Sequence, residues 1–451
     1  MLHRKIESEI RNWIHNDERA LLVYGVRQAG KTYIIRKCLE DEGCDYVEFN
    51  LIENPEIAEI IESASNTDDL INKLSLFSTG RITPHKTIIF LDEIQKCKEI
   101  VTRIKFLVDD SRYRYVMSGS LLGVELTNLR SAPVGYMSML KMYPLDFEEF
   151  LQVFNVPDAV LGLVKDSFRD RVPVDDVIHK RLMDLFDLYI VIGGMPAAVE
   201  KYRTSGNIDR VIDIHRDIIE QYKLDFTQYE EESRRLILTA IYELVPSELN
   251  EQNKRFKIAD IDKNLRYERV ADSFTWLNKA GVTLPVYNVT QPMMPLMINE
   301  KSSLLKLFMS DTGMLTSIYG KPTKLKILNK DKDVTKGAVY ENVIAQELTA
   351  HGYDLYYYNS KKHGELDFVV EDLGRVLPIE VKSGKDYTKH SALSAVMRED
   401  AYNIDDAAVF SASNVSVVNG VSYLPLYMVM AMQKDEVRFA DISVEKYKWD
   451  I

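Results

Sequence analysis

The sequence predicts an α/β protein whose first 155 residues form a parallel sheet covered by helices. Strand-like and helix-like segments alternate over this region, which is the pattern of a sheet built from strand–helix–strand units. Two of the strands are followed by polar groups: a glycine-rich loop comes after residues 21–24, and two acids end residues 87–93. Because ligands collect at the carboxyl ends of parallel strands, we expect a binding site at this edge of the sheet.

The glycine-rich loop at 25–32 reads Gly-Val-Arg-Gln-Ala-Gly-Lys-Thr, which is the phosphate-binding P-loop pattern G-x-x-x-x-G-K-[ST]. An apolar strand precedes it and a helix-like segment follows it, so backbone N–H groups would point at a triphosphate. We expect Lys31 to reach the β- and γ-phosphates and the Thr32 hydroxyl to bind Mg²⁺. The residues expected to bind ATP are Gly25, Arg27, Gln28, Ala29, Gly30, Lys31, Thr32 and Tyr33.

The apolar strand at 87–91 ends in Asp92 and Glu93, which is the Walker B pattern, and a continuous apolar run indicates a buried parallel strand. We expect Asp92 to hold Mg²⁺ and Glu93 to polarise the water that attacks the γ-phosphate. A third strand, 113–117, ends in Ser118-Gly119-Ser120. Either serine is a candidate for contact with the γ-phosphate or the water, although serine and glycine are also ordinary turn residues.

Apolar periodicity places the other elements up to residue 300. In the first region it predicts strands at 45–49 and 137–142 and helices at 55–64, 67–77 and 97–109. Residues 156–227 read as helices interrupted by Gly193-Gly194-Met195-Pro196, and we interpret them as a helical lid. Residues 228–300 supply three short helices and a strand at 286–289, the order of a winged-helix domain. Such a domain binds DNA through a recognition helix or acts as a spacer, and both interpretations stay open.

After residue 301 the chain again contains predicted strands, and two successive strands each carry an acidic residue. Asp367 lies on one strand, Glu380 and Lys382 lie on the next, and Glu341 lies on a preceding helix. Since side chains alternate along a strand, Glu380 and Lys382 share a face, and Asp367 meets Glu380 across the ladder. An acid followed after about a dozen residues by E-x-K is the skeleton of PD-(D/E)XK nucleases.

This cluster suits metal-dependent cleavage of a phosphodiester. Carboxylates such as those of Glu341, Asp367 and Glu380 are the oxygen ligands that Mg²⁺ prefers, and Lys382 would orient the attacking water or offset charge. Alternating Glu and Lys is, however, also typical of a half-exposed strand. The pattern therefore predicts a nuclease-like fold, and cleavage is a separate question.

Composition narrows the class of protein. A chain of 451 residues with 46% hydrophobic and 28% charged residues is typical of a globular protein of about three domains. It has no apolar run of about 18 residues and no apolar signal core at its start, so we expect no membrane span and a cytoplasmic location. Three cysteines without metal-ligand spacing fit a reducing compartment. The net charge of −12 argues against coating nucleic acid but leaves room for a local basic groove.

These patterns divide the chain into four predicted domains. They are a P-loop ATPase core at 1–155, a helical lid at 156–227, a winged-helix-like domain at 228–300, and a C-terminal α/β domain of the restriction-endonuclease-like, PD-(D/E)XK type at 301–451.

Together the motifs resemble a large bacterial and archaeal family of AAA-type P-loop ATPases that carry a C-terminal domain of unknown function with a nuclease-like fold. The resemblance covers nearly the whole chain and is carried by residues 25–32, 90–95, 118–120, 144–151, 192–196, 311–315, 364–368 and 379–384. It implies ATP binding, Mg²⁺-dependent hydrolysis and a nuclease-like module. Relatives often carry Gly-Arg where this chain has Gly135-Tyr136. Arg130 is the candidate replacement for that arginine as a finger on the γ-phosphate, and a surface arginine is the alternative.

Two functions fit this organisation. The first is an ATP-driven enzyme whose C-terminal domain cuts nucleic acid, and the second is a nucleotide-controlled switch whose C-terminal domain binds a partner without cleavage. Helicase action fits less well, since the sequence shows no second core and no basic groove that tracks a strand. The expected ligands are ATP or ADP, with DNA as a candidate partner of the winged-helix and C-terminal domains, and the chain is compatible with an oligomer.

Overall fold

The chain folds into two compact units, each built from several segments. The first comprises Met1–Leu161, Asp184–Pro285 and Leu307–Val334, and the second comprises Gly162–Met183, Val286–Lys306 and Thr335–Ile451. The division into four consecutive domains stays a prediction, and these two units divide the chain differently. The computed structural model describes residues 2–97, 99–120, 135–229, 232–251, 253–331 and 336–434.

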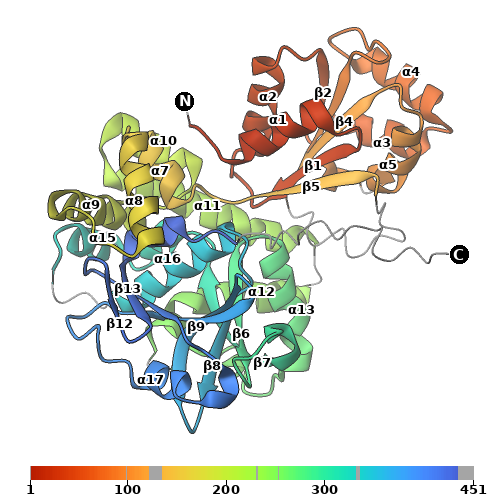
Figure 1. Ribbon diagram of the computed structural model, residues 1–451. Coiled ribbons are helices and arrows are strands. Elements are labelled where there is room, and N and C mark those ends of the chain that lie inside the picture. The colour runs from red at the N-terminus through yellow and green to blue at the C-terminus, as the bar shows by residue number, and fades with distance from the viewer. Residues whose placement is uncertain are drawn as a thin grey trace, which may run out of the picture. The chain divides into compact units, whose positions relative to one another are not determined.

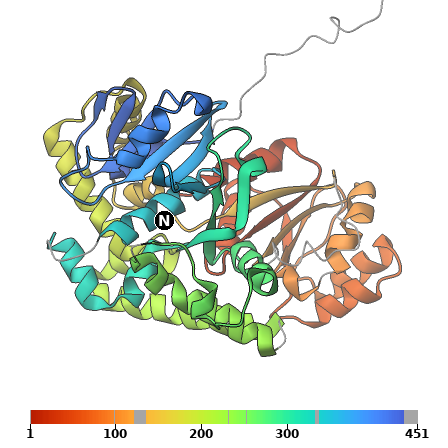
Figure 2. The same ribbon diagram turned by 90° about the horizontal axis from the view of Figure 1, so that it is seen from below.

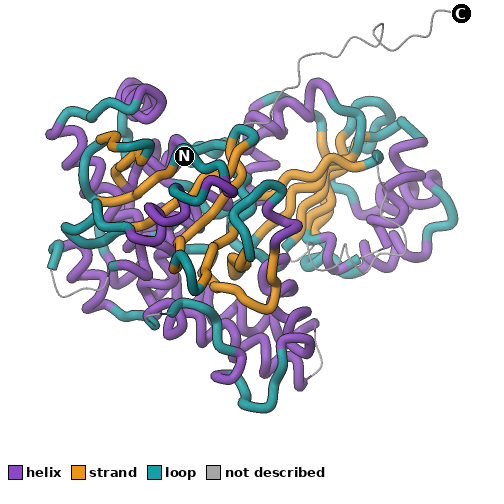
Figure 3. The backbone as a smooth tube through the Cα atoms, turned by 60° about the horizontal axis from the view of Figure 1, so that its bottom comes forward, coloured by secondary structure: helices purple, strands orange, loops and turns teal. Residues whose placement is uncertain are grey.

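The first unit contains the predicted parallel sheet. Its strand order is β2-β3-β4-β1-β5, and all of its pairings are parallel, so the carboxyl ends of the strands meet at one edge. Figure 3 shows these strands running side by side. The observed bounds lie close to the predicted ones: β1 (Ala20–Gly25), β2 (Tyr46–Asn50), β3 (Ile88–Asp92), β4 (Arg114–Gly119) and β5 (Met137–Met142).

Helices cover both faces of this sheet (Figure 1). On one face α2 contacts β1 and β4, and α1 packs on α2. On the other face, apolar side chains of α3, α4 and α5 form a core with alternate strand residues such as Leu22, Ile89 and Met117. Each such buried side chain contributes about 1.5–3 kcal/mol to folding. The bounds are α1 (Ile6–Asn16), α2 (Lys31–Asp41), α3 (Glu56–Ser63), α4 (Thr67–Phe77), α5 (Glu99–Asp109) and the short η1 (Ile94–Lys96).

The chain continues with further helices. Most of them belong to the first unit, where α11 packs against α10, α12 and α14, whereas most of α8 and the start of α9 fall in the second unit. The segment expected to be a helical lid is helical, but its residues 162–183 belong to the second unit. The bounds are α7 (Phe147–Val153), α8 (Asp158–Asp170), α9 (Asp176–Ile192), α10 (Pro196–Ser205), α11 (Ile208–Tyr229), α12 (Glu232–Asn250), η3 (Ile258–Asp260), α13 (Tyr267–Lys279), α14 (Thr312–Ile318) and α15 (Lys321–Leu328).

Hydropathy singles out one helix pair. No single helix among the described residues is long and apolar enough to cross a membrane, whereas α9 and α10, bent by 118° at their junction, pass that test together by length and composition alone. Phe186, Ile190 and Val199 of this pair are fully buried, which is what the core helices of a folded domain show.

The second sheet is mixed and has the order β12-β13-β11-β10-β9-β8-β6-β7. Strand β9 is antiparallel to β8 and β10, and β10 is parallel to β11. Helix α16 packs against β10 (Figure 2), and α17 packs against β9. The bounds are β6 (Thr283–Val289), η4 (Leu296–Asn299), β7 (Glu300–Met309), α16 (Gly337–Ala350), β8 (Tyr356–Ser360), β9 (Gly364–Asp372), β10 (Arg375–Val381), α17 (Ser391–Met397), η5 (Asp400–Tyr402), β11 (Ala407–Ser411), β12 (Ser416–Val418), β13 (Val421–Pro425) and η6 (Leu426–Ala431).

The strand expected to form a wing lies in this second sheet. Residues 286–289 are part of β6, which pairs in parallel with β8 through Tyr287 opposite Tyr356. The three expected helical segments before it are present as α12, η3 and α13. A short run of strand type looks the same in sequence whether it forms a hairpin or joins a larger sheet. The winged-helix interpretation therefore stays a prediction.

Close backbone contacts join distant segments of the first unit. The N–H of Leu145 donates to the carbonyl of Gly194 at 2.7 Å, and the N–H of Gly194 donates to Asp311 Oδ2 at 2.6 Å. A Cβ on Gly194 would lie 2.1 Å from the Leu145 carbonyl oxygen, and one on Gly313 would lie 2.5 Å from the Gly193 nitrogen. These positions therefore need glycine, which explains the Gly-Gly and Asp-Thr-Gly motifs of the sequence.

Replacing Gly194 by alanine should destabilise the first unit, because the added carbon has no room against backbone atoms that cannot swing away. We expect a loss of about 3 kcal/mol or more, measured as the shift of the urea unfolding midpoint. Gly80→Ala is the matched control, since its Cβ would meet only a Val47 methyl group at 3.5 Å. Equal stability of the two variants would contradict this account of the junction.

Candidate functional site

The P-loop lies between β1 and α2 and has the strained geometry that its sequence predicts. Gly25 has φ +148° and Gly30 has φ +93°, conformations that disfavour side chains. A Cβ on Gly25 would lie 2.1 Å from the Met142 carbonyl oxygen of β5, so only glycine fits. No side chain caps the first turn of α2, and its backbone N–H groups are therefore available to an anion.

Lys31 is held over the loop. Its Nζ donates to the carbonyl of Gly25 at 3.1 Å and to that of Val26 at 3.0 Å. Burial lowers the pKa of Lys31 to about 8, against the opposing effect of Glu93 and Asp92. A buried ammonium without a hydrogen-bonded carboxylate needs an anionic partner. The phosphates of a nucleotide fit this need.

Asp92 is the centre of a hydrogen-bond network at the sheet edge. Its carboxylate accepts from Thr32 Oγ1 at 2.9 Å, from Asn50 Nδ2 at 3.0 Å and from the Ser118 hydroxyl. Burial raises the pKa of Asp92, while the hydrogen bonds from Ser118 and Thr32 oppose that shift. The ends of β2, β3 and β4 and the start of α2 thus converge on one carboxylate. Ser118, a candidate for contact with phosphate or water, binds Asp92 here.

Glu93 follows directly in a left-handed conformation, with φ 60°. Such a conformation costs a residue with a side chain about 1–3 kcal/mol and is typical of functional sites. The amide of Gln95 donates to the Glu93 carboxylate and, at 3.2 Å, to the Ser120 hydroxyl. Gln95 therefore orients Glu93 and links it to the end of β4. The oxygens of Glu93, Asp92 and Thr32 form a donor set that suits Mg²⁺ and water beside a phosphate chain.

Arg4 holds the loop in place, and the sequence analysis did not find it. Its guanidinium is buried, donates to the carbonyl of Ala29 at 3.0 Å and to that of Tyr143 at 2.7 Å, and pairs with Glu149 at 3.1 Å. These bonds join the segment just before α1 to the P-loop, the end of β5 and α7. No local pattern marks an isolated arginine near the N-terminus, so only the fold reveals this role.

Other residues predicted for the site differ in their surroundings. Arg27 Nη1 lies 2.6 Å from Asp225 Oδ1 of α11, and the amide of Gln28 donates to Gln221 of the same helix. Tyr33 is 48% exposed on α2. Arg130, the candidate finger, lies outside the described residues. The nucleotide contacts of these residues stay predictions.

The structure also brings together the acid, acid and lysine set of the second unit. Phe368 on β9 pairs with Ile379 on β10, which places Asp367 beside Glu380. Asp367 Oδ2 accepts from the N–H of Val381 at 2.8 Å, and Lys382 Nζ lies 2.6 Å from Glu380 Oε2. Burial and then the neighbouring Asp367 raise the pKa of Glu380 to about 8.

A second lysine, Lys306 on β7, reaches this cluster and was not foreseen. Its side chain is fully buried, and its Nζ lies 2.7 Å from Glu365 Oε1. Burial acts to lower the pKa of Lys306, but the carboxylates of Glu341, Asp367 and Glu365 outweigh it and hold the pKa above its ordinary value. Within the described parts of the chain, no group of three or more His, Cys, Asp or Glu side chains is arranged to hold a metal ion. The metal-binding role of Glu341, Asp367 and Glu380 stays a prediction.

Comparison with known proteins gives three matches to family models. Residues 17–151 match a family described as "AAA domain", residues 183–325 match "Domain of unknown function (DUF8612)", and residues 336–428 match "Domain of unknown function (DUF4143)". Each match covers less than half of the chain. No curated protein matches the chain.

Several solved structures are similar at low identity. The Walker-type ATPase PABY2304 of Pyrococcus abyssi is 15% identical with a TM-score of 0.42, covering 71% of this chain and 96% of that one. The Orc1 protein of Aeropyrum pernix, in complex with DNA, is 14% identical with a TM-score of 0.28, covering 73% and 93%. Cdc6p of Pyrobaculum aerophilum is 11% identical with a TM-score of 0.25, covering 73% and 96%. Residues 17–151 match the AAA family model and contain the P-loop and the parallel sheet. They therefore form an AAA-type ATPase domain.

Proposed function

We propose that this protein binds ATP with Mg²⁺ at the edge of the first sheet, hydrolyses it, and uses the nucleotide state to control its second unit. The observation that carries the proposal is the Asp92 network beside Lys31. The buried carboxylate of Asp92 holds the Thr32 hydroxyl at 2.9 Å, and the Lys31 ammonium donates to the loop carbonyls of Gly25 and Val26. This is the donor arrangement that a magnesium-bound triphosphate needs.

Each residue of the site has a distinct task in this mechanism. Lys31 leaves the carbonyls of the loop and donates to the phosphates, while Thr32 supplies a ligand for Mg²⁺ and Asp92 holds that ligand shell. Glu93, oriented by Gln95, accepts the hydrogen bond of the attacking water and fixes its direction. When bound, Mg²⁺ neutralises the negative charge that develops on the phosphate oxygens.

The charged cluster of the second unit favours binding of a partner over cleavage of nucleic acid. The buried ammonium of Lys306 already compensates the carboxylates of Glu341, Asp367 and Glu365, which weakens the case for a divalent cation there. Cleavage of nucleic acid remains a second candidate, because Asp367, Glu380 and Lys382 lie together as a nuclease needs. DNA is the candidate partner of this unit and of the winged-helix-like segment.

Lys31→Ala should abolish nucleotide binding, since it removes the buried cation that faces the phosphates. We expect the affinity for a fluorescent ATP analogue to fall by about 100-fold or more, measured by equilibrium titration. Lys73→Ala is the control, because Lys73 pairs with Asp69 on the surface of α4 and should bind as the wild type does. Unchanged binding by Lys31→Ala would show that the loop is not the nucleotide site.

Glu93→Gln should bind ATP normally and turn it over about 100–10,000-fold more slowly, because the amide cannot act as a base toward water. The rate of phosphate release measures this, with Glu99→Gln of α5 as the matched control, because the Glu99 side chain is 45% exposed and pairs with Arg103. Wild-type turnover in Glu93→Gln would require a different water-positioning residue.

Asp367→Ala tests the second candidate function. Plasmid and single-stranded DNA are incubated with Mg²⁺ or Mn²⁺, with and without ATP, and the products are separated on gels. If the cluster cleaves, the wild type cuts and the variant loses about 100-fold or more of the rate. If the wild type cuts DNA under none of these conditions, cleavage is rejected and the nucleotide-controlled switch is the remaining function.

A further inference from the structure

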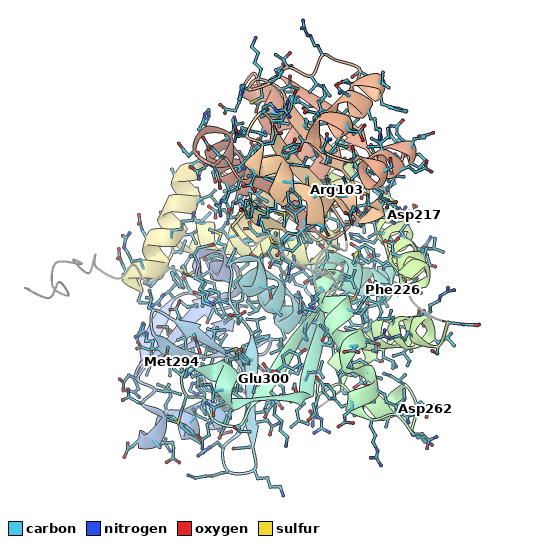
Figure 4. All side chains as sticks on the ribbon, turned by 90° about the vertical axis from the view of Figure 1, so that its right-hand side faces the viewer. Arg103, Asp217, Phe226, Asp262, Met294 and Glu300 are labelled. Atoms are coloured by element: carbon cyan, nitrogen blue, oxygen red, sulfur yellow. The ribbon has the colours of Figure 1, made fainter. Side chains whose placement is uncertain are left out.

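The P-loop is attached to one stretch of α11 by side chains of its central residues. Arg27 Nη1 lies 2.6 Å from Asp225 Oδ1, the amide of Gln28 donates to Gln221, and the Tyr222 hydroxyl donates to the Arg27 carbonyl at 3.3 Å. Residues 221, 222 and 225 lie on one side of a helix. Figure 4 labels Asp217 and Phe226, which bracket this stretch of α11.

The ion pair lies near residues of the expected nucleotide site. The charge of Arg27 contributes to lowering the pKa of Lys31, so the two cations are close. On its other side, Asp225 is near both Lys96 and Glu93, whose charges act on its pKa. The pair is thus within electrostatic range of Lys31, expected to hold the γ-phosphate, and of Glu93, expected to direct the water.

Arg27 and Asp225 differ in how far their side chains are exposed to solvent. The Asp225 side chain is 3% exposed and that of Arg27 is 28% exposed. Separating the pair leaves the buried carboxylate of Asp225 without its hydrogen-bonded guanidinium, which costs free energy. The partly exposed guanidinium can therefore leave Asp225 only for an anion that binds it strongly. A guanidinium binds carboxylate and phosphate through the same planar set of N–H groups. A γ-phosphate beside the loop would therefore compete with Asp225 for Arg27.

We propose that Arg27 is a sensor of the γ-phosphate: it pairs with Asp225 when the γ-phosphate is absent and with the γ-phosphate when ATP is bound. The proposal rests on the ATP binding proposed above and adds a sensing residue from within the loop itself. Loss of the Arg27 contact removes the hydrogen-bonded cation of Asp225 and releases one attachment of α11 to the loop. Since α11 packs on α10, α12 and α14, the nucleotide state reaches these helices.

The test compares dissociation constants of ADP and of the non-hydrolysable ATP analogue AMPPNP, measured by calorimetry on the full chain with Mg²⁺. Asp225→Asn frees Arg27, so AMPPNP should bind about tenfold more tightly while the affinity for ADP stays unchanged. Arg27→Gln should weaken AMPPNP about tenfold and again leave ADP unchanged. Asp110→Asn is the control, because the Asp110–Arg112 pair precedes β4 at the opposite edge of the sheet.

Two outcomes would overturn the sensor. In the first, both variants change the affinities for ADP and AMPPNP by the same factor, which is what a purely structural role of the pair produces. In the second, neither variant changes the ratio of the two affinities. Failure of the wild type to bind either nucleotide would instead reject the ATP site itself, and the sensor with it.

Hydrogen exchange of α11 gives a second readout that needs only the wild type. With AMPPNP, the backbone amides of residues 217–226 should exchange faster than with ADP, because the contact of Asp225 with Arg27 is released. Asp225→Asn should remove this difference between the two nucleotides. Identical exchange of α11 with AMPPNP and ADP in the wild type would contradict the proposal, even where a variant fails to fold.

Discussion

The carboxylate of Asp92 is the group on which the arrangement of the first unit depends. A buried charge is tolerated only when hydrogen bonds replace its water, and Asp92 receives them from Thr32, Asn50 and Ser118. These donors lie at the start of α2 and at the ends of β2 and β4. The parallel sheet with β1 between β4 and β5 brings them to one edge, so the fold and the site satisfy the same electrostatic requirement.

The P-loop is fixed from two sides, and the two attachments differ in kind. Arg4, just before α1, binds the carbonyl of Ala29 and is buried with Glu149, so this attachment is closed off from solvent. Arg27, on the other side, binds a carboxylate of α11 through a partly exposed guanidinium. In the proposed mechanism, the Arg4 attachment holds the loop in place, and the Arg27 attachment exchanges between Asp225 and the γ-phosphate, so the loop distinguishes ATP from ADP.

Local patterns predicted the parts of the site that are contiguous in sequence. The P-loop and the strand ending in Asp92 and Glu93 carry their own flanking signals, and the observed strands match them. Asn50 and Asp225 at the P-loop site, and Lys306 at the cluster of the second unit, could not be predicted. Each comes from a distant segment, and only tertiary packing brings it to its site. The same reason explains why β6, expected as a wing, lies beside β8 in the second sheet. The Asp367 and Glu380 pair was predictable, since strand alternation and register are local rules.

The most direct test of this account measures phosphate release from ATP by the wild type and by Asp92→Asn, each with Mg²⁺ and with the metal chelated. The account predicts turnover by the wild type that requires Mg²⁺, and a loss of about 100-fold or more in Asp92→Asn, which keeps the size of the side chain but not its charge. Equal turnover of the two proteins, or turnover without Mg²⁺, would contradict the central role given to the Asp92 carboxylate.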